Sequence, residues 1–205
     1  MTKTPQSVTM VIEVIFMFND FYNIYKSARD ASWRFLIDYN ITQLPVNLKP
    51  ITDKLNIKVK FGDERVLNPG QKGLTITDGV ETYIVVRKGI STAETRYIII
   101  HELGHGYLGH PLIDGKYART FDVDKQYEYE AERFAIDVLA PACVLWGLNL
   151  HTAEDIARVC NISITSAQRR AERMRILYDR NMFLSHPLER QVFSQFKNFI
   201  DSQNK

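Results

Sequence analysis

The sequence predicts an α+β fold, in which a small antiparallel or mixed three-stranded sheet packs on one long helix that contains the segment HELGH, with further helices and a C-terminal helical segment. Apolar residues alternate with lysines over residues 57–61, as in a half-buried strand. An Asp-Gly pair at 78–79 joins the β-rich runs 74–77 and 82–87, as in a hairpin. Apolar residues at helical spacing dominate most of the remaining chain.

The helices are placed by their periodicity and by signals at their ends. Ser91 and Glu94 form a capping box, so the HELGH helix is expected to begin near Thr92 and to run to about His110, where Pro111 stops it. Residues 112–124 lack clear periodicity and are expected to form an exposed loop. Helical spacing predicts the other helices: one or two within 8–39, a short one after Pro45, then 125–139, 153–159, 165–177 and a final amphipathic helix that opens at Pro187.

Length and composition restrict the class of protein. With 205 residues, 45% hydrophobic and 24% charged, the chain resembles ordinary globular domains, which argues against disorder and against a membrane bundle. The apolar run 8–18 is too short to span a bilayer and contains Glu13, so no membrane anchor or signal peptide is expected and the cytoplasm is the default location.

Cys143 and Cys160 are expected to be buried free thiols. The net charge of +2 is too small to indicate a nucleic-acid partner.

The HELGH segment has the residue types and the spacing of a metal site. On a helix, His101 and His105 lie four residues apart, so both imidazoles project from one face and can share one ion. Glu102 is rotated by roughly 100° from His101, which places its carboxylate beside the ion and suits a general base. Zinc with three protein ligands keeps one position for a water molecule and makes that water acidic enough for deprotonation. Two unrelated buried histidines would be the alternative interpretation.

A third ligand is expected from the acidic residues of the helix at 125–139. Glu128 and Glu132 lie four residues apart on one face, whereas Glu130 points to a different side. We therefore expect Glu128 to bind the metal and Glu132 to accept a hydrogen bond from the second ring nitrogen of a metal-bound histidine. A solvated helix face, with ion pairs to Lys125 or Arg133, is the alternative for each of these carboxylates.

The two motifs together resemble one family of metallopeptidases. HELGH and the later run EYEAERFAIDVLAP, from Glu128 to Pro141, are similar to the ImmA/IrrE family, whose pattern is HExGH followed by ExEANxFAxxLLMP. The similarity extends upstream through LPV at 44–46, the NIKV strand, Gly73 and YIVVRKGIS, and it covers about residues 30–180.

This resemblance implies a function as well as a fold. It implies that His101, His105 and Glu128 bind Zn²⁺ and that Glu102 is the catalytic base of a zinc-dependent endopeptidase. It also implies that the substrate is a protein, a transcriptional repressor of the helix-turn-helix kind, and that the chain acts in transcription regulation or in a mobile element.

Two positions depart from the family pattern. Glu132 stands where the family usually has asparagine, and Ala140 stands where it usually has methionine. The first departure adds a negative charge near the predicted metal and bears directly on the predicted role of Glu132.

The resemblance also suggests how the chain is divided. We expect an N-terminal helical extension over 1–29, a zinc-peptidase catalytic domain over 30–150, a helix-turn-helix-like segment over 151–180 that packs on it, and a C-terminal amphipathic helix over 181–205.

Two other functions remain open on the sequence. Residues 153–177 could form a DNA-binding helix-turn-helix whose second helix carries several arginines, although the segment's net charge of only about +2 is weak for phosphate binding. A non-proteolytic regulator that uses the fold to bind a repressor is the other alternative.

The group that stabilises the transition state is not assigned by the sequence. Five residues lie near enough in the chain to be candidates, but packing is the favoured role for each: Tyr107, His110, Tyr117, Tyr127 and Tyr129. His151 and His186 fall at predicted helix starts and are expected to be capping or surface residues.

Overall fold

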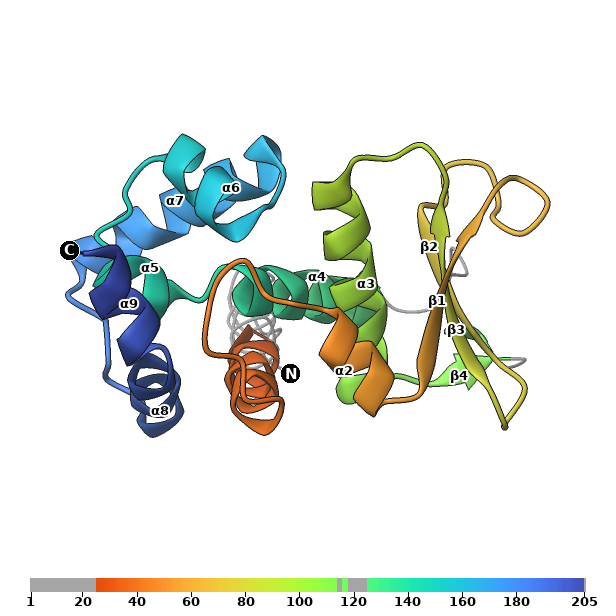
Figure 1. The fold of residues 1–205 in the computed structure, drawn as a ribbon, viewed down its shortest axis with the longest axis horizontal. Helices are drawn as coiled ribbons and strands as arrows, with labels where there is room; N and C mark the ends of the chain where they lie inside the picture. The colour runs from red at the N-terminus through yellow and green to blue at the C-terminus, as the bar shows by residue number, and fades with distance from the viewer. Residues whose placement is uncertain (1–24, 114–115, 118–124, 205) are drawn as a thin grey trace, which may run out of the picture.

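The computed structural model describes residues 25–113, 116–117 and 125–204 (Figure 1). The predicted extension over residues 1–29 therefore lies mostly outside the described residues. The first described helix covers residues 25–38, and α2 follows over Lys49–Lys54 with Pro50 in its first turn. No boundary between the predicted segments is tested by this fold, so the division of the chain stays a prediction.

The predicted α+β fold is confirmed, and its sheet is mixed. β1 (Ile57–Gly62) runs parallel to β3 (Thr82–Arg87), and β3 pairs antiparallel with β2 (Gly73–Thr77). The hairpin turn between β2 and β3 is held by the Asp78 carboxylate, which accepts hydrogen bonds from the backbone of Val80 and Glu81. The three longer strands therefore form the sheet that the sequence predicts.

Two short strands extend this sheet where the sequence predicted only a loop. β4 (Leu112–Ile113) and β5 (Lys116–Tyr117) pair with each other, and β5 pairs with β2, which gives the order β1-β3-β2-β5-β4. Each of these strands has two residues, too few to show the period-two pattern on which a strand prediction depends.

Helix α3 (Thr92–Tyr107) contains HELGH and packs between the sheet and α4 (Lys125–Leu139). Ser91 caps its first turn by accepting a hydrogen bond from the backbone of Glu94, as predicted. The helix ends three residues before His110, because the chain turns at Gly109, where φ is +74°. This turn brings His110 back toward the helix.

The C-terminal helices gather at the opposite end of the molecule from the sheet (Figure 1). Their bounds are α5 (Ala142–Gly147), α6 (Ala153–Cys160), α7 (Ile164–Asp179), α8 (Pro187–Gln195) and α9 (Lys197–Gln203). The final predicted helix is thus two helices, and the sequence did not predict α5. Both cysteines are buried free thiols, as expected. None of the helices in the described ranges is long and apolar enough to cross a membrane.

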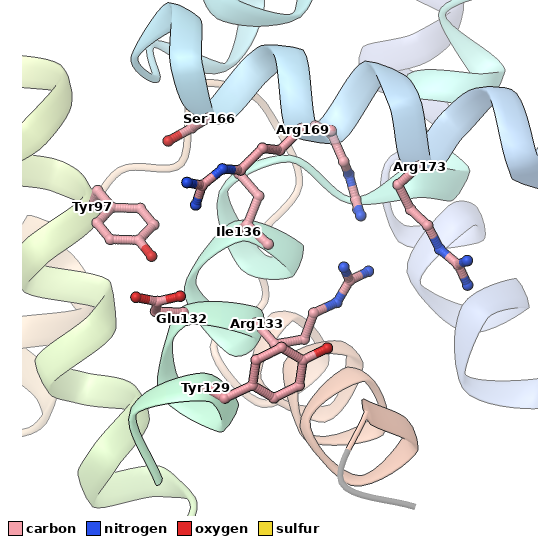
Figure 2. Close-up of a pocket in the computed structure, with 9 residues that line it drawn as sticks. Tyr97, Tyr129, Glu132, Arg133, Ile136, Ser166, Arg169 and Arg173 are labelled. Atoms are coloured by element: carbon pink, nitrogen blue, oxygen red, sulfur yellow. The ribbon is translucent and has the colours of Figure 1, made fainter. Parts of the chain in front are cut away.

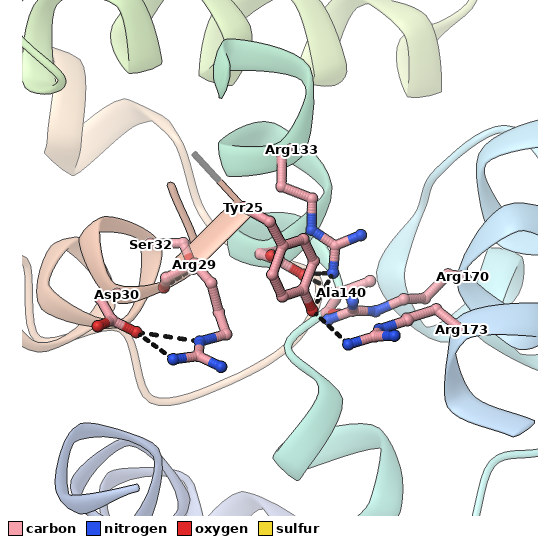
Figure 3. Close-up of polar contacts among 9 residues, drawn as sticks. Tyr25, Arg29, Asp30, Ser32, Arg133, Ala140, Arg170 and Arg173 are labelled. Carbon is pink, nitrogen blue, oxygen red and sulfur yellow. Dashed lines mark hydrogen bonds and ion pairs between the residues drawn. The ribbon is translucent and has the colours of Figure 1, made fainter. Parts of the chain in front are cut away.

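A buried ion-pair network ties α7 to α4. Asp137 on α4 accepts hydrogen bonds from Arg133 on its own helix and from Arg170 on α7, and Arg170 also donates to the backbone oxygen of Ala140 (Figure 3). Burial alone raises the pKa of Asp137, but the two guanidinium groups outweigh it and lower that pKa below its ordinary value. The α6–α7 pair is therefore fixed to the helix that carries Glu128.

Candidate metal centre

Three predicted ligands come together between α3 and α4. The Nε2 atoms of His101 and His105 lie 3.1 Å apart, and Glu128 places one carboxylate oxygen 3.4 Å from each of them. Both imidazoles are buried and Glu128 is half-buried. His101 and His105 project from one face of α3 because they are one turn apart, and Glu128 faces them from the first turn of α4.

This geometry fits a tetrahedral metal ion. Zinc bonds of about 2.0–2.2 Å at tetrahedral angles place neighbouring ligand atoms roughly 3.3 Å apart. The observed separations of 3.1, 3.4 and 3.4 Å match that value without any rearrangement. Two imidazoles and one carboxylate are also a ligand set found in catalytic zinc sites, which leave the fourth position open.

Close packing between α3 and α4 depends on Gly104. A Cβ atom at this position would lie 2.8 Å from Cδ1 of Phe134, whose side chain is fully buried. The missing side chain lets α4 approach α3 closely, and the buried face of α4 carries Ala131 and Ala135 beside Phe134. The glycine that weakens the helix locally thus allows the two ligand-bearing helices to meet.

The predicted base, Glu102, is buried on the sheet side of α3. Its carboxylate accepts a hydrogen bond of 2.9 Å from the Thr75 hydroxyl on β2, and both residues are almost inaccessible to solvent. Gly73 makes room for this contact, because a Cβ atom there would lie 2.2 Å from Ile98 and 3.2 Å from the carboxylate itself. The sheet therefore fixes the orientation of Glu102, and sequence reasoning missed the role of Thr75.

His110 and Glu130 together orient the imidazole of His105. The Nδ1 atoms of His105 and His110 are 2.9 Å apart, and Nε2 of His110 lies 3.0 Å from the Glu130 carboxylate. Nδ1 of His105 is held by this chain of contacts, so Nε2 is the nitrogen that could bind an ion. Helical periodicity could not find His110, since it lies beyond the end of α3 and reaches His105 only through the turn at Gly109.

Glu132 lies on the same side of α4 as Glu128 and is exposed. Among the described residues, Nδ1 of His101 is buried and has no hydrogen-bond partner, so Glu132 does not bind that atom. The predicted contact between Glu132 and a metal-bound histidine stays a prediction for the metal-loaded protein.

A groove of about 640 Å³ opens beside the ligands. His101, Glu128 and Glu132 line one part of it, and Tyr97 and Arg169 line another. Tyr97 lies one turn before His101 on α3, and its ring stacks on the imidazole with centroids 6.1 Å apart. Tyr97 was not among the predicted site residues, although its position four residues before His101 places it on the same face of the helix.

The remaining candidate residues are distributed as follows. Tyr107 lies among core rings and donates a hydrogen bond to Asp38, Tyr127 packs against His110, and Tyr129 lines a second pocket. The side chain of Tyr117 lies outside the described residues. His151 is exposed and contacts Asn149, whereas His186 caps α8 through the backbone of Leu188, as expected for residues outside the site.

Comparison with known proteins supports the same interpretation. A family model described as the IrrE N-terminal-like domain, of the M78 peptidases, matches residues 53–172, which include all the proposed metal ligands. An "uncharacterized immunity region protein 2" of Bacillus phage phi105 is 39% identical over 66 residues, which are 31% of this chain and 40% of that protein. His101, His105 and Glu128 form a candidate metal site within the matched residues, and the chain belongs to the ImmA/IrrE family, whose matching model is one of peptidases.

Proposed function

We propose that the protein is a zinc-dependent endopeptidase that hydrolyses a peptide bond in a transcriptional repressor. The observation that carries this proposal is the convergence of His101, His105 and Glu128, whose side-chain atoms lie at separations that suit one shared metal ion, beside the buried carboxylate of Glu102. The site opens to a groove that can receive an extended segment of another chain.

The chemistry follows from the positions of these groups. His101, His105 and Glu128 would hold the zinc ion, which would supply an acidified water and polarisation of the scissile carbonyl. Glu102 accepts the proton of the attacking water and then delivers it to the nitrogen of the departing amine, so the carboxylate is unchanged after each turnover. Thr75 keeps the Glu102 carboxylate in place by its hydrogen bond, and the contact of His110 with Nδ1 of His105 leaves Nε2 turned toward the metal.

The proposal of a repressor as substrate rests on two supports. The family resemblance implies a substrate of this class, and the phage relative is named as an immunity region protein. A repressor substrate also implies that the protein acts in the cytoplasm.

The DNA-binding alternative receives no support from the orientation of α7. Of its arginines, Arg170 is buried against α4 and Arg173 contacts the hydroxyl of Tyr25, so both face the protein itself. Arg175 is exposed and lies near Glu172 and Asp179. Only some of the arginines of α7 are therefore available to contact DNA phosphates.

New protein N-termini provide the test of this function. Host cells expressing the wild type, Glu102→Gln or Glu172→Gln are compared by N-terminal peptide mass spectrometry. We expect N-termini that occur with the wild type and with Glu172→Gln, an exposed control on α7, and that are missing with Glu102→Gln. Identical N-termini in all three cultures would contradict proteolysis and favour the non-proteolytic alternative.

Metal analysis of the purified protein tests the cofactor. We expect about one zinc per chain in the wild type and in Glu102→Gln, because Glu102 is not a ligand. His105→Ala should lose the metal. Full zinc content in His105→Ala would contradict the proposed centre.

A further inference from the structure

A second, smaller pocket adjoins the groove and is lined by four arginines. This arginine pocket has a volume of about 160 Å³, and its lining includes Arg133, Arg169, Arg170 and Arg173. It shares Tyr97, Glu132, Ser166 and Arg169 with the groove that contains the metal ligands. Figure 2 shows side chains of α3, α4 and α7 directed toward this space.

The positive charge of the pocket exceeds the carboxylates available to it. Arg133 and Arg170 share the single carboxylate of Asp137. Asp137 lies outside the lining of the pocket, and Glu132 is the single acidic residue among the described residues that line it. Two of the four guanidinium groups therefore form no ion pair with a carboxylate among the described residues.

The unmatched groups are Arg169 and Arg173. Within the described part of the chain, Arg169 forms no hydrogen bond or ion pair, and its guanidinium extends toward Tyr97 (Figure 2). Arg173 donates from Nη2 to the hydroxyl of Tyr25, whereas its Nε is buried without a hydrogen-bond partner among the described residues (Figure 3). A buried donor without an acceptor is unfavourable, so a ligand oxygen that reaches this Nε would bind favourably.

We propose that the arginine pocket is a subsite for an acidic side chain of the substrate, an aspartate or glutamate located a few residues from the scissile bond. The proposal rests on the proposed peptidase function, because the groove that leads to the metal ligands defines where the peptide lies. A carboxylate matches both the charge and the planar donors of the guanidinium groups. The pocket thereby determines sequence preference and not the chemical step.

A peptide fits this pocket better than a nucleic acid does. The arginines lie in a small concavity, and the adjoining groove is lined by carboxylates of Glu94, Glu128 and Glu132. A concavity of this size can receive one acidic side chain, whereas a duplex needs a continuous basic surface along its phosphate backbone.

A binding experiment tests the subsite without requiring cleavage. Fluorescein-labelled hexaglutamate and hexaglutamine are titrated against full-length Glu102→Gln protein by fluorescence anisotropy. We expect hexaglutamate to bind more tightly, and its affinity to fall about tenfold when Arg169→Gln is added. Arg175→Gln is the matched control, since it removes the same charge from the same helix outside the pocket.

The outcomes of this titration are distinct. Equal affinity for the two peptides, or equal losses in Arg169→Gln and Arg175→Gln, would overturn the proposal. Tighter binding of a short DNA duplex with the same dependence on Arg169 would also overturn it, in favour of a nucleic-acid site. Arg173→Gln should lower the affinity for hexaglutamate further. Arg169 is exposed, so Arg169→Gln should fold, and its titration tests the proposal even if the Arg173→Gln protein does not fold.

Cleavage of a proteome-derived peptide library gives a second readout. The wild type should cut sites enriched in aspartate or glutamate at one fixed position, and the enrichment should disappear in Arg169→Gln but persist in Arg175→Gln. Cleavage without any acidic preference would overturn the subsite while supporting the peptidase. A complete lack of cleavage would contradict the peptidase function, and the anisotropy titration would still decide whether the pocket binds acidic side chains.

Discussion

Asp137→Asn should destabilise the protein strongly, because one carboxylate neutralises two guanidinium groups. Asp137 and Arg170 side chains are 5% and 2% exposed and lie 2.6 Å apart, and Arg133 is 2.8 Å away on the other side. The substitution keeps the shape but leaves both cations without their shared anion. Removing one partner of a buried ion pair lowers stability by about 3–5 kcal/mol. For a chain of this size, that corresponds to a fall in Tm of roughly 10 °C.

The assay is urea unfolding, followed by circular dichroism, of the wild type and two variants. Asp179→Asn is the control, since it removes the same group from an exposed pair on α7 and should change the free energy of unfolding by less than about 1 kcal/mol. A loss in Asp137→Asn that is no larger than the loss in Asp179→Asn would refute the argument that this network holds α7 to α4.

The same network predicts how stability depends on pH. The folded-state pKa of Asp137 is lowered, so its ionised form stabilises the native state. The difference in unfolding free energy between the wild type and Asp137→Asn should be fully present above the unfolded-state pKa of about 3.9. It should then shrink as pH falls through the lower folded-state pKa. Titration of the unfolding free energy in both proteins measures this difference, and an advantage that stays constant down to strongly acidic pH would contradict the assignment.

Three further perturbations test the core and the site. Gly104→Ala places a Cβ atom 2.8 Å from Phe134, so we expect stability to fall by about 1–3 kcal/mol in urea unfolding, together with weaker zinc binding. Thr75→Val removes the hydrogen-bond donor of Glu102, and kcat/KM for the identified substrate should fall about tenfold with zinc content unchanged. Burial raises the pKa of the Cys160 thiol to about 12, so neither cysteine should react with a thiol reagent at pH 8 until the protein is unfolded.

Each of these tests has a control. Adding Phe134→Leu should restore part of the stability lost in Gly104→Ala, and strictly additive losses would argue against the proposed contact. Thr77→Val changes the same strand near the hairpin turn, away from Glu102, and should leave kcat/KM unaffected. Rapid modification of the native protein would show that a thiol is accessible.

Local sequence patterns were sufficient to predict the framework of the site. The four-residue spacing of His101 and His105 fixes their common face on any helix, and the capping box at Ser91 fixes where that helix begins. The Asp-Gly pair predicted the hairpin that covers Glu102, because the pair favours a tight turn. Each of these features depends only on residues that are close together in the chain, so a single sequence is sufficient to predict the helix, its first turn and the hairpin.

Contacts between distant elements could not be read in the same way. The sequence placed Glu130 on a different side of its helix from Glu128, yet Glu130 reaches the site through His110 because the chain turns at Gly109. Thr75 looked like any strand residue until β2 packed on α3. The two short strands near the end of α3 contain too few residues to show a pattern.

The sequence by itself was sufficient to predict which side chains are candidates to bind a metal and to act as the base, since helical geometry converts spacing into direction. Only the tertiary structure decided how Glu128 meets the two histidines, which residues orient His105 and Glu102, and that arginines of α7 gather beside the groove. These arrangements depend on the packing of α3, α4, α7 and the sheet, and packing is set by complementary surfaces far apart in the chain.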